Sequence, residues 1–320
     1  MDDLLKKANA LLTGGLAPKP HLMRNRLKMK EGQLLDLMAL ARLTAGKSLS
    51  PFTCGIINIK SGRCGEDCSF CSQSSHYNSN VVNYPMMGID GILRRLEALL
   101  ALGVRYVGLV ASGGQLNDRD FSKLLRAARV IGTNYEVKLC ASIGFLDESR
   151  AAQLKEAGFC SCHHNLEAAP DFFPKLCGSH SFEARIDTIK IAKKAGLRVC
   201  SGGIFGAGES WEHRLDLALL LKELEVDSTP LNFLMPIEGT PLGEREPLSP
   251  AEALRIIALF RLVNSTADLV ICGGRELALK SLKSLVFSAG ANGIMIGDYL
   301  TAKGSLPDSD LMEMAALELR

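Results

Sequence analysis

Short runs of apolar and β-branched residues alternate with longer segments of helical periodicity along most of the chain. We expect eight of these runs to form strands, namely residues 55–59, 106–112, 136–144, 159–167, 198–206, 229–235, 269–273 and 293–297. Alternating strands and helices favour a parallel sheet that is covered by helices. Eight such units in about 250 residues favour an α/β fold of one closed (β/α)8 TIM-type barrel over an open sheet.

The segments between the strands carry signals for helix ends. Ser249, Pro250 and Glu252 form a capping box with proline at the first helical position. The first fifty residues resemble a helical extension, with an amphipathic segment at 4–11 and an apolar one at 32–45. No linker rich in proline or serine divides the rest, so we expect a helical extension over 1–50 and one barrel domain over 51–320.

The composition of the chain limits which kinds of binding partner are expected. The chain has 320 residues, 47% of them hydrophobic, and a net charge of +2. A sizeable core is therefore expected, and no basic surface argues for nucleic acid or an anionic membrane. No run of about 20 apolar residues predicts a membrane helix. The first residues lack the pattern of a secretory signal, which predicts a cytoplasmic protein whose ten cysteines are reduced.

Three of these cysteines follow the first predicted strand. Cys64, Cys68 and Cys71 are spaced C-x3-C-x2-C on a polar loop that contains glycine. In a barrel this loop lies at the C-terminal end of the strands, where active sites are built. Three thiolates on so short a loop suit three irons of a 4Fe-4S cluster and leave the fourth iron without a ligand from the loop. A zinc site with His76 as the fourth ligand is the alternative.

A second set of cysteines lies within predicted strands. Cys140 and Cys200 share a strand face with Ser142 and Gly202, which favours an inward orientation. Cys272 belongs to a third strand, so three thiols on alternate strands are expected to converge in the barrel. Each of them, taken singly, is equally well explained as a small core residue.

The remaining cysteines carry weaker signals. Cys54 lacks a partner at ligand spacing and is predicted to be a small buried hydrophobic residue. By the two-residue period of a strand, Cys160 and Cys162 lie on the face opposite to that of Asn165. We therefore expect both side chains to point toward the helices, unless a bulge in the strand reverses their orientation. His163 shares the face of Asn165 and is expected to point toward a cluster or substrate. Cys177 lies in a loop without an identifiable partner.

The loop from Cys64 to Cys71, with aromatic Phe70 before the last cysteine, resembles the radical S-adenosylmethionine (SAM) superfamily. Within that superfamily, residues 64–75 resemble the corresponding loop of the biotin synthase family. Further matching segments are residues 164–167, 182–188, 199–209, 231–234, 239–242 and 289–292. The resemblance extends from about residue 53 to residue 301, which is nearly the whole predicted barrel.

The resemblance implies a set of site residues. Cys64, Cys68 and Cys71 are expected to hold a 4Fe-4S cluster whose open iron chelates the amino and carboxylate groups of SAM. The residues expected to contact SAM are Phe70, Asn165, Glu167 and Arg185, and those expected to contact dethiobiotin are Asn165 and Asn232. For Arg185, a surface ion pair with Asp187 or Glu183 is the alternative.

The resemblance also implies an auxiliary iron-sulfur cluster, the presumed sulfur donor, deep in the barrel. Cys140 and Cys200 fall on two of its usual cysteine positions. The family's cysteine on the second strand is missing here, and Val270 replaces its arginine ligand. Cys272 lies two residues after Val270 on the same face. Our hypothesis is that Cys140, Cys200 and Cys272 hold a 4Fe cluster with an extra sulfide rather than a 2Fe-2S cluster.

The activity implied is that of a radical SAM sulfurtransferase that converts dethiobiotin into biotin. A reduced flavodoxin or ferredoxin as electron donor and a homodimer are implied with it. Related barrels of the hydrogenase maturase or methylornithine synthase type are one alternative, and a non-catalytic metal-binding module is another. Asn232 and the strand cysteines favour sulfur insertion.

Overall fold

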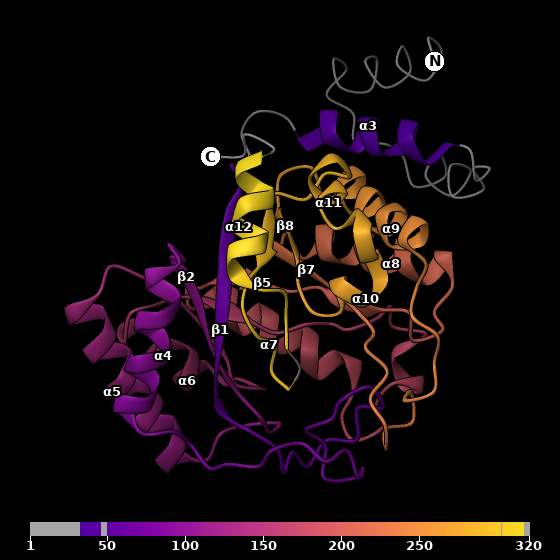
Figure 1. Cartoon of the computed structure of the whole chain (residues 1–320). Coiled ribbons are helices and arrows are strands. Elements are labelled where there is room, and N and C mark those ends of the chain that lie inside the picture. Colours follow the sequence, from indigo (N-terminus) through magenta and orange to yellow (C-terminus); the bar gives the residue numbers. More distant parts are fainter. Residues whose placement is uncertain (1–32, 46–49, 302, 317–320) are drawn as a thin grey trace.

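The computed structural model describes residues 33–45, 50–301 and 303–316. Its strands form one parallel sheet in the order β5-β4-β3-β2-β1-β9-β8-β7-β6, and β5 also pairs with β7, which closes the barrel (Figure 1). The strands are β1 (Phe52–Lys60), β2 (Tyr106–Ala111), β3 (Lys138–Ser142), β4 (Phe159–His163), β5 (Arg198–Cys200), β6 (Gly203–Phe205), β7 (Ser228–Phe233), β8 (Asp268–Ile271) and β9 (Gly293–Met295). The closed parallel barrel confirms the predicted fold class.

Helices surround the barrel, with α4, α5 and α6 on one side and α8, α9 and α10 on the other (Figure 1). The helices are α3 (Leu34–Ala45), α4 (Ile89–Ala101), α5 (Asp118–Asn134), α6 (Glu148–Glu156), α7 (Phe182–Lys194), α8 (Trp211–Glu223), α9 (Pro250–Val263), α10 (Arg275–Leu279), α11 (Leu285–Ser288) and α12 (Pro307–Ala316), with short 3₁₀ turns at Phe173–Lys175 and Lys280–Leu282. Helix α9 begins at the predicted position, where the Ser249 side chain accepts a hydrogen bond from the backbone N–H of Glu252. The reciprocal half of the predicted capping box is replaced, because the Glu252 carboxylate accepts from Arg214 at 2.6 Å.

Helix α3 packs on α9 and α11 at the end of the barrel opposite the loop that follows β1 (Figure 1). Its buried face consists of Met38, Leu40, Ala41 and Ala45. The other predicted N-terminal segment, residues 4–11, lies outside the described residues. The division of the chain at residue 50 therefore stays a prediction.

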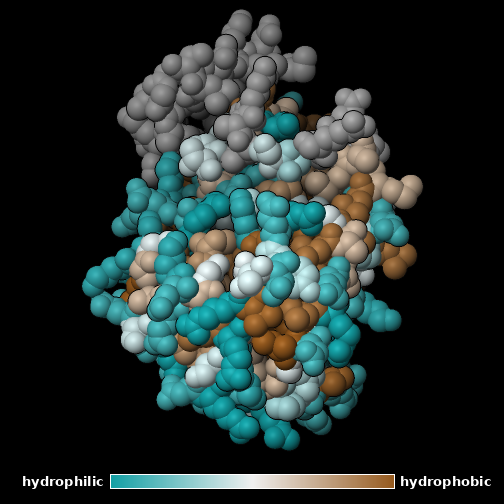
Figure 2. Space-filling model, turned by 90° about the vertical axis from the view of Figure 1, so that its left-hand side faces the viewer, coloured by the Kyte–Doolittle hydropathy of each residue, from teal (hydrophilic) through white to brown (hydrophobic). Residues whose placement is uncertain are grey.

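The surface on the side of α4 and α5 is largely hydrophilic, with small hydrophobic areas (Figure 2). Within the part of the chain that the structure describes, no helix combines the length and the apolar character that crossing a membrane requires.

The fifth predicted strand, residues 198–206, is divided into β5 and β6. Its ladder is interrupted at Gly202, whose N–H donates to the Asn165 side chain and whose carbonyl accepts from Leu166 and Glu167. The chain also passes β7 closely there, because a Cβ on Gly202 would lie 1.9 Å from the carbonyl oxygen of Pro230. A glycine is thus required at the point where the barrel closes.

A buried arginine connects α9 to the loop before β9. The Arg261 guanidinium is fully buried and donates to the carbonyls of Gly290, Asn264 and Ala267 and to the Asn292 side chain, at 2.6–3.0 Å. Burial lowers the pKa of Arg261 to about 10, so the side chain remains charged at neutral pH. One side chain thereby satisfies several buried acceptors.

Arg261→Met should lower the free energy of unfolding by about 3–5 kcal/mol, because the carbonyls lose their donor without access to water. Urea unfolding of the iron-free protein measures the effect. Arg129→Met, at an exposed site of α5, is the matched control and should change the free energy of unfolding by less than about 0.5 kcal/mol. Equal effects of the two substitutions would show that the buried hydrogen bonds contribute nothing specific.

Candidate active site

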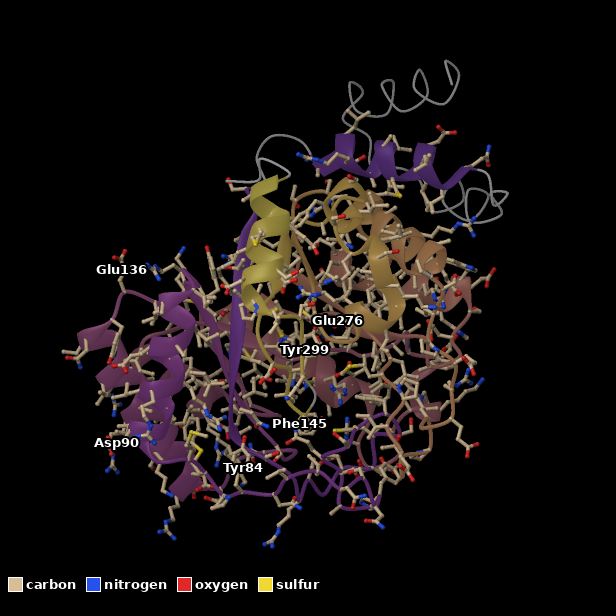
Figure 3. All side chains as sticks on the ribbon, viewed as in Figure 1. Tyr84, Asp90, Glu136, Phe145, Glu276 and Tyr299 are labelled. Carbon is tan, nitrogen blue, oxygen red and sulfur yellow. The ribbon has the colours of Figure 1, made fainter. Side chains whose placement is uncertain are left out.

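The barrel encloses a cavity of about 460 Å³. Its wall includes Phe145 and Tyr299, which Figure 3 labels, and the Tyr299 hydroxyl donates to the Glu276 carboxylate at 2.9 Å. Eight of the chain's ten cysteines line this cavity: Cys54, Cys64, Cys68, Cys71, Cys140, Cys160, Cys200 and Cys272. Such a concentration of thiols along one cavity is typical of a site for thiophilic metals.

The loop after β1 brings Cys64, Cys68 and Cys71 to the cavity wall, as predicted. The loop folds back on itself, because the Cys64 N–H donates to the Gln73 carbonyl and the Cys71 N–H to the Cys68 carbonyl, both at 2.9 Å. Burial raises the pKa of Cys71 to about 11. A hydrogen bond to Cys177 and burial raise the pKa of Cys68 further. Metal binding at these thiols would release protons.

The zinc alternative with His76 is not formed. His76 is exposed, and its Nε2 lies 2.9 Å from the Gly65 carbonyl oxygen. Among the described residues, the group of three potential ligands whose atoms lie within 4.8 Å of one another is Cys68, Cys177 and His180. The three loop thiols are spread more widely, which suits a cluster in which each thiolate holds a separate iron.

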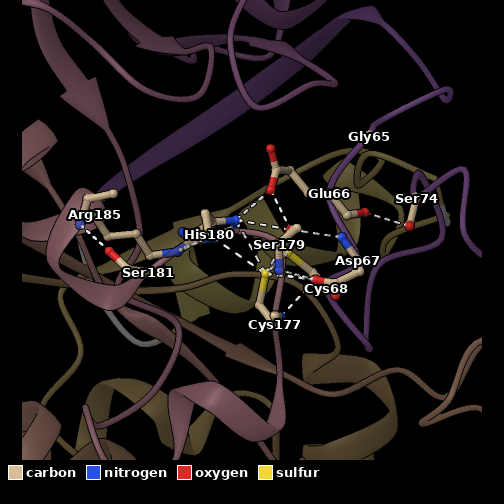
Figure 4. Close-up of polar contacts among 12 residues, drawn as sticks. Gly65, Glu66, Asp67, Cys68, Ser74, Cys177, Ser179, His180, Ser181 and Arg185 are labelled. Carbon is tan, nitrogen blue, oxygen red and sulfur yellow. Dashed lines mark hydrogen bonds and ion pairs between the residues drawn. The ribbon is translucent and has the colours of Figure 1, made fainter.

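A second loop, residues 176–181, is attached to the cysteine loop on both sides of Cys68 (Figure 4). The Ser69 N–H donates to the Leu176 carbonyl at 2.7 Å. The Asp67 carboxylate accepts from the N–H groups of Gly178 and Ser179, each at 2.9 Å. These hydrogen bonds offset the burial of Asp67 and hold the pKa of its carboxyl below its usual value.

Because the two loops are joined, Cys177 contacts Cys68, a pairing that the sequence did not reveal. Its Sγ lies 3.6 Å from the Cys68 Sγ and 3.3 Å from the His180 Nδ1. The hydrogen bond from Cys68 lowers the pKa of Cys177 to about 7. His180 is oriented by Glu66, at 2.6 Å from Nδ1, and by the Arg185 Nε, which donates to Nε2 at 3.0 Å. No spacing signal in the sequence links residues so far apart.

The second cysteine set also reaches the cavity. Cys140 lies in β3, Cys200 ends β5, and Cys272 directly follows β8. Burial raises the pKa of Cys200 to about 12 and also raises those of Cys140 and Cys272 well above their usual value, with contributions from the neighbouring thiols. His163 points into the same space, with its Nδ1 3.4 Å from the Cys200 Sγ, and burial lowers its pKa to about 4. These four side chains share the space that the sequence predicted for them.

Two predictions about the other cysteines were wrong. Cys54 is not a core residue, because its partly exposed thiol lines the cavity. It lies close enough to Cys140, Cys200 and Cys272 to help raise their pKa values. Cys160 also lines the cavity, because the register between β3 and β4 shifts by a bulge after Leu139. Cys162 is buried in the core, as predicted.

Asn165, Glu167 and Arg185 lie together at the cavity wall. Arg185 is 8% exposed, so the alternative of a surface ion pair was wrong. Its Nη1 donates to the Asn165 carbonyl at 2.7 Å and lies 3.9 Å from the Glu167 Oε1. Burial raises the pKa of Glu167, although Arg185 opposes the shift. Glu167 adopts a φ of +69°, which directs it toward this group at a cost in backbone strain.

Phe70 and Asn232 complete the predicted set on the same wall. The Asn232 carboxamide is fixed by the backbone, since its Oδ1 accepts from the Gly273 N–H at 3.1 Å and its Nδ2 donates to the Gly203 carbonyl at 3.4 Å. The structure thus places every predicted site residue at one cavity.

Comparisons with known proteins agree with this geometry. Residues 58–221 match the Radical SAM superfamily, and residues 230–320 match the Biotin and Thiamin Synthesis associated domain. A biotin synthase of Nitratidesulfovibrio vulgaris (strain DSM 19637 / Miyazaki F) is 48% identical over 301 residues, covering 91% of this chain and 83% of that protein. A biotin synthase of Geobacter sulfurreducens is 41% identical over 320 residues, covering 98% and 95%.

Solved structures share the fold at low identity. A methylornithine synthase has a TM-score of 0.78 at 20% identity, covering 90% of this chain and 85% of that one. The FeFe-hydrogenase maturase HydG from Carboxydothermus hydrogenoformans has a TM-score of 0.80 at 14% identity, covering 99% and 78%. These likenesses establish the barrel alone, whereas the sequence relatives define a narrower group. On their identity and coverage, the chain belongs to the biotin synthase family of the radical SAM superfamily.

Proposed function

We propose that this chain converts dethiobiotin into biotin as a radical SAM sulfurtransferase. The observation that supports this most directly is the presence of two sets of thiols in one cavity, one on the loop after β1 and one on the barrel strands. SAM cleavage needs the first set alone, so the second set is available to hold a cluster that donates sulfur. A reduced flavodoxin or ferredoxin as electron donor, a homodimer and a cytoplasmic location belong to the same proposal.

Cys64, Cys68 and Cys71 would hold the 4Fe-4S cluster. Their soft sulfur donors suit iron, and the wide spacing of the three loop thiols allows each to hold a separate iron. When bound, this cluster and SAM supply a 5'-deoxyadenosyl radical. The barrel wall around the cavity keeps water and stray hydrogen donors away from the reacting atoms.

The protein orients SAM through Asn165, Glu167 and Arg185. The Glu167 carboxylate is suited to accept hydrogen bonds from the two ribose hydroxyls, and Arg185 is suited to the methionine carboxylate. Because Arg185 also donates to the Asn165 carbonyl, the three groups are held in fixed relative positions. Phe70 contributes an aromatic face at the same wall. Asn232 offers a neutral amide to the neutral ureido ring of dethiobiotin.

Cys140, Cys200 and Cys272 would hold the auxiliary cluster, the sulfur source. Three thiolates leave one corner of a 4Fe cluster free for an extra sulfide, which favours that type over a 2Fe-2S cluster with four ligands. Cys54 and Cys160 are two further thiols that line this cavity. Cys54 pairs with Met295 of β9, next to the end of β8 that Cys272 follows. We assign both to the cavity wall rather than to the ligand set.

Glu167 should make SAM binding depend on pH. Its carboxyl has a raised pKa, so lowering the pH from neutrality protonates it earlier than an ordinary glutamate. The protonated acid accepts hydrogen bonds more weakly, and the KM for SAM should rise as the pH falls. Glu167→Gln should raise the KM at neutral pH about tenfold or more and remove this dependence. Glu183→Gln, at an exposed site of α7, should change neither.

A single-turnover assay tests the proposed function. Anaerobically reconstituted protein with dethiobiotin, SAM and reduced flavodoxin is expected to form biotin and 5'-deoxyadenosine. Formation of 5'-deoxyadenosine without biotin would contradict sulfur insertion and favour a barrel of the methylornithine synthase type. Protein that takes up iron or zinc but cleaves no SAM would contradict an enzymatic role altogether.

A further inference from the structure

The contact between Cys68 and Cys177 is not explained by the proposed reaction. Their sulfur atoms lie 3.6 Å apart, and both side chains are at most 8% exposed (Figure 4). All ten cysteines are free, and in the described part of the chain this is the one pair of thiols in direct contact. One of the two is a proposed cluster ligand, and the other neither lines the cavity nor has a role in the reaction.

Backbone hydrogen bonds on both sides of the two cysteines hold this contact in place. Leu176 accepts from the Ser69 N–H, and Asp67 accepts from the two N–H groups that follow Cys177. The two sulfurs therefore sit on segments that are joined on either side of both cysteines. A disulfide needs the sulfurs to approach to about 2.05 Å, so their separation must close by roughly 1.5 Å.

We propose that Cys68 and Cys177 form a reversible disulfide when an oxidant removes the cluster. The inference rests on the proposed function only in assigning Cys68 to the cluster. Its consequence is that Cys68 stays in a form that thiols can reduce, so the cluster can be rebuilt after oxidative damage.

Access from the cavity determines which of the two cysteines reacts with the oxidant first. Cys68 lines the cavity and is open to a small peroxide, whereas Cys177 does not line it. The Cys68 thiol passes its proton to a neighbouring acceptor and its sulfur attacks the peroxide O–O bond, becoming a sulfenic acid, while the released hydroxide takes up a proton and leaves as one water. Cys177 then attacks the Cys68 sulfur, and the hydroxyl leaves as a second water while the S–S bond forms. Two thiols and one hydrogen peroxide thus give one disulfide and two waters, with Cys177 as the resolving cysteine.

The environment of Cys177 suits this role. His180 Nδ1 lies 3.3 Å from its sulfur, and the Asp67 Oδ1 lies 3.1 Å away, so proton acceptors surround the resolving thiol. Cys64 and Cys71 lack such a partner, since neither contacts another thiol in the described residues. The structure therefore favours one pairing over a mixture.

Peptide mapping tests the proposal on the full chain. Reconstituted protein is treated anaerobically with a chelator to remove iron, exposed to one equivalent of hydrogen peroxide, alkylated and digested. We expect the 68–177 disulfide in most wild-type chains and its disappearance after dithiothreitol. A 64–71 disulfide, or no disulfide at all, would overturn the proposal. Biotin formation plays no part in this measurement, so its outcome is separate from that of the proposed function.

Recovery of the cluster tests the consequence. After excess peroxide followed by dithiothreitol, wild-type protein should take up its iron again, whereas Cys177→Ser should recover several-fold less, because Cys68 is oxidised beyond the sulfenic acid. Cys162→Ser, another buried cysteine without a thiol partner, is the matched control and should recover like wild type. Equal recovery by Cys177→Ser and wild type would contradict a protective role. If Cys177→Ser takes up little iron even before oxidation, its recovery has no reference value. The peptide mapping of the wild-type protein then tests the proposal by itself.

Discussion

Replacing Cys71 by alanine should abolish both SAM cleavage and biotin formation. The cysteine loop then offers two thiolates where the cluster needs three, and Cys177, the further thiol beside the loop, contacts Cys68 rather than Cys71. We expect the rate of 5'-deoxyadenosine formation to fall by roughly three orders of magnitude or more, since no other group in the cavity is suited to cleave SAM. Chromatographic measurement of 5'-deoxyadenosine under reducing, anaerobic conditions gives the rate.

Cys162→Ala is the control for this loss. Cys162 is equally a cysteine and is buried, but it belongs to the core and does not line the cavity. The control should keep its iron and its rate within about twofold, although its stability falls slightly through the small void. SAM cleavage by Cys71→Ala at a rate near that of the control would refute the assignment of the loop.

The sequence was sufficient for the barrel because strand periodicity, helix caps and the spacing of the elements all agree. It was also sufficient for the cysteine loop, whose three proposed ligands lie within eight residues of one another. Such local patterns are determined by neighbouring residues along the chain. Phe70, Asn165 and Arg185 were found through resemblance, and their common wall is visible only once the barrel closes.

Predictions that assumed an unbroken strand failed. Cys160 faces the cavity because one bulge between β3 and β4 reverses the alternation that the sequence favours. Cys54 was predicted to be a small buried residue because it lacks a partner at ligand spacing, but its neighbours in the cavity are thiols on other strands. The strand at 198–206 divides where Asn165, distant in sequence, takes the Gly202 amide. The errors at Cys160 and at residues 198–206 arise from contacts with strands that are distant in sequence.

The loop that carries Cys177 illustrates the remaining limit. Its position depends on hydrogen bonds between Asp67 and residues about 110 positions later in the chain. Neither segment has a periodicity that predicts the other. A single sequence therefore identifies the cysteines but not this pair.

Replacing Cys200 by alanine should separate the two halves of the reaction. The SAM loop remains intact in this variant, so 5'-deoxyadenosine should still form at a rate within about tenfold of wild type. Biotin should fall below detection, because the proposed auxiliary cluster loses one of three thiolates. Iron per chain should fall to the content of a single 4Fe-4S cluster. Cys140→Ala and Cys272→Ala are expected to behave in the same way.

Cys54→Ala is the sharpest control, because Cys54 lines the same cavity and lies near all three proposed ligands. If three thiolates hold the cluster, Cys54→Ala keeps the iron content and the single-turnover yield of wild type. If Cys54→Ala loses the auxiliary iron while Cys272→Ala retains it, the ligand set is wrong. Mössbauer spectra of the same samples distinguish a 4Fe cluster from a 2Fe-2S cluster. Because Cys54 and Cys272 lie at the same level on the two sides of β9, the two substitutions show which of these neighbouring thiols holds the iron of the sulfur source.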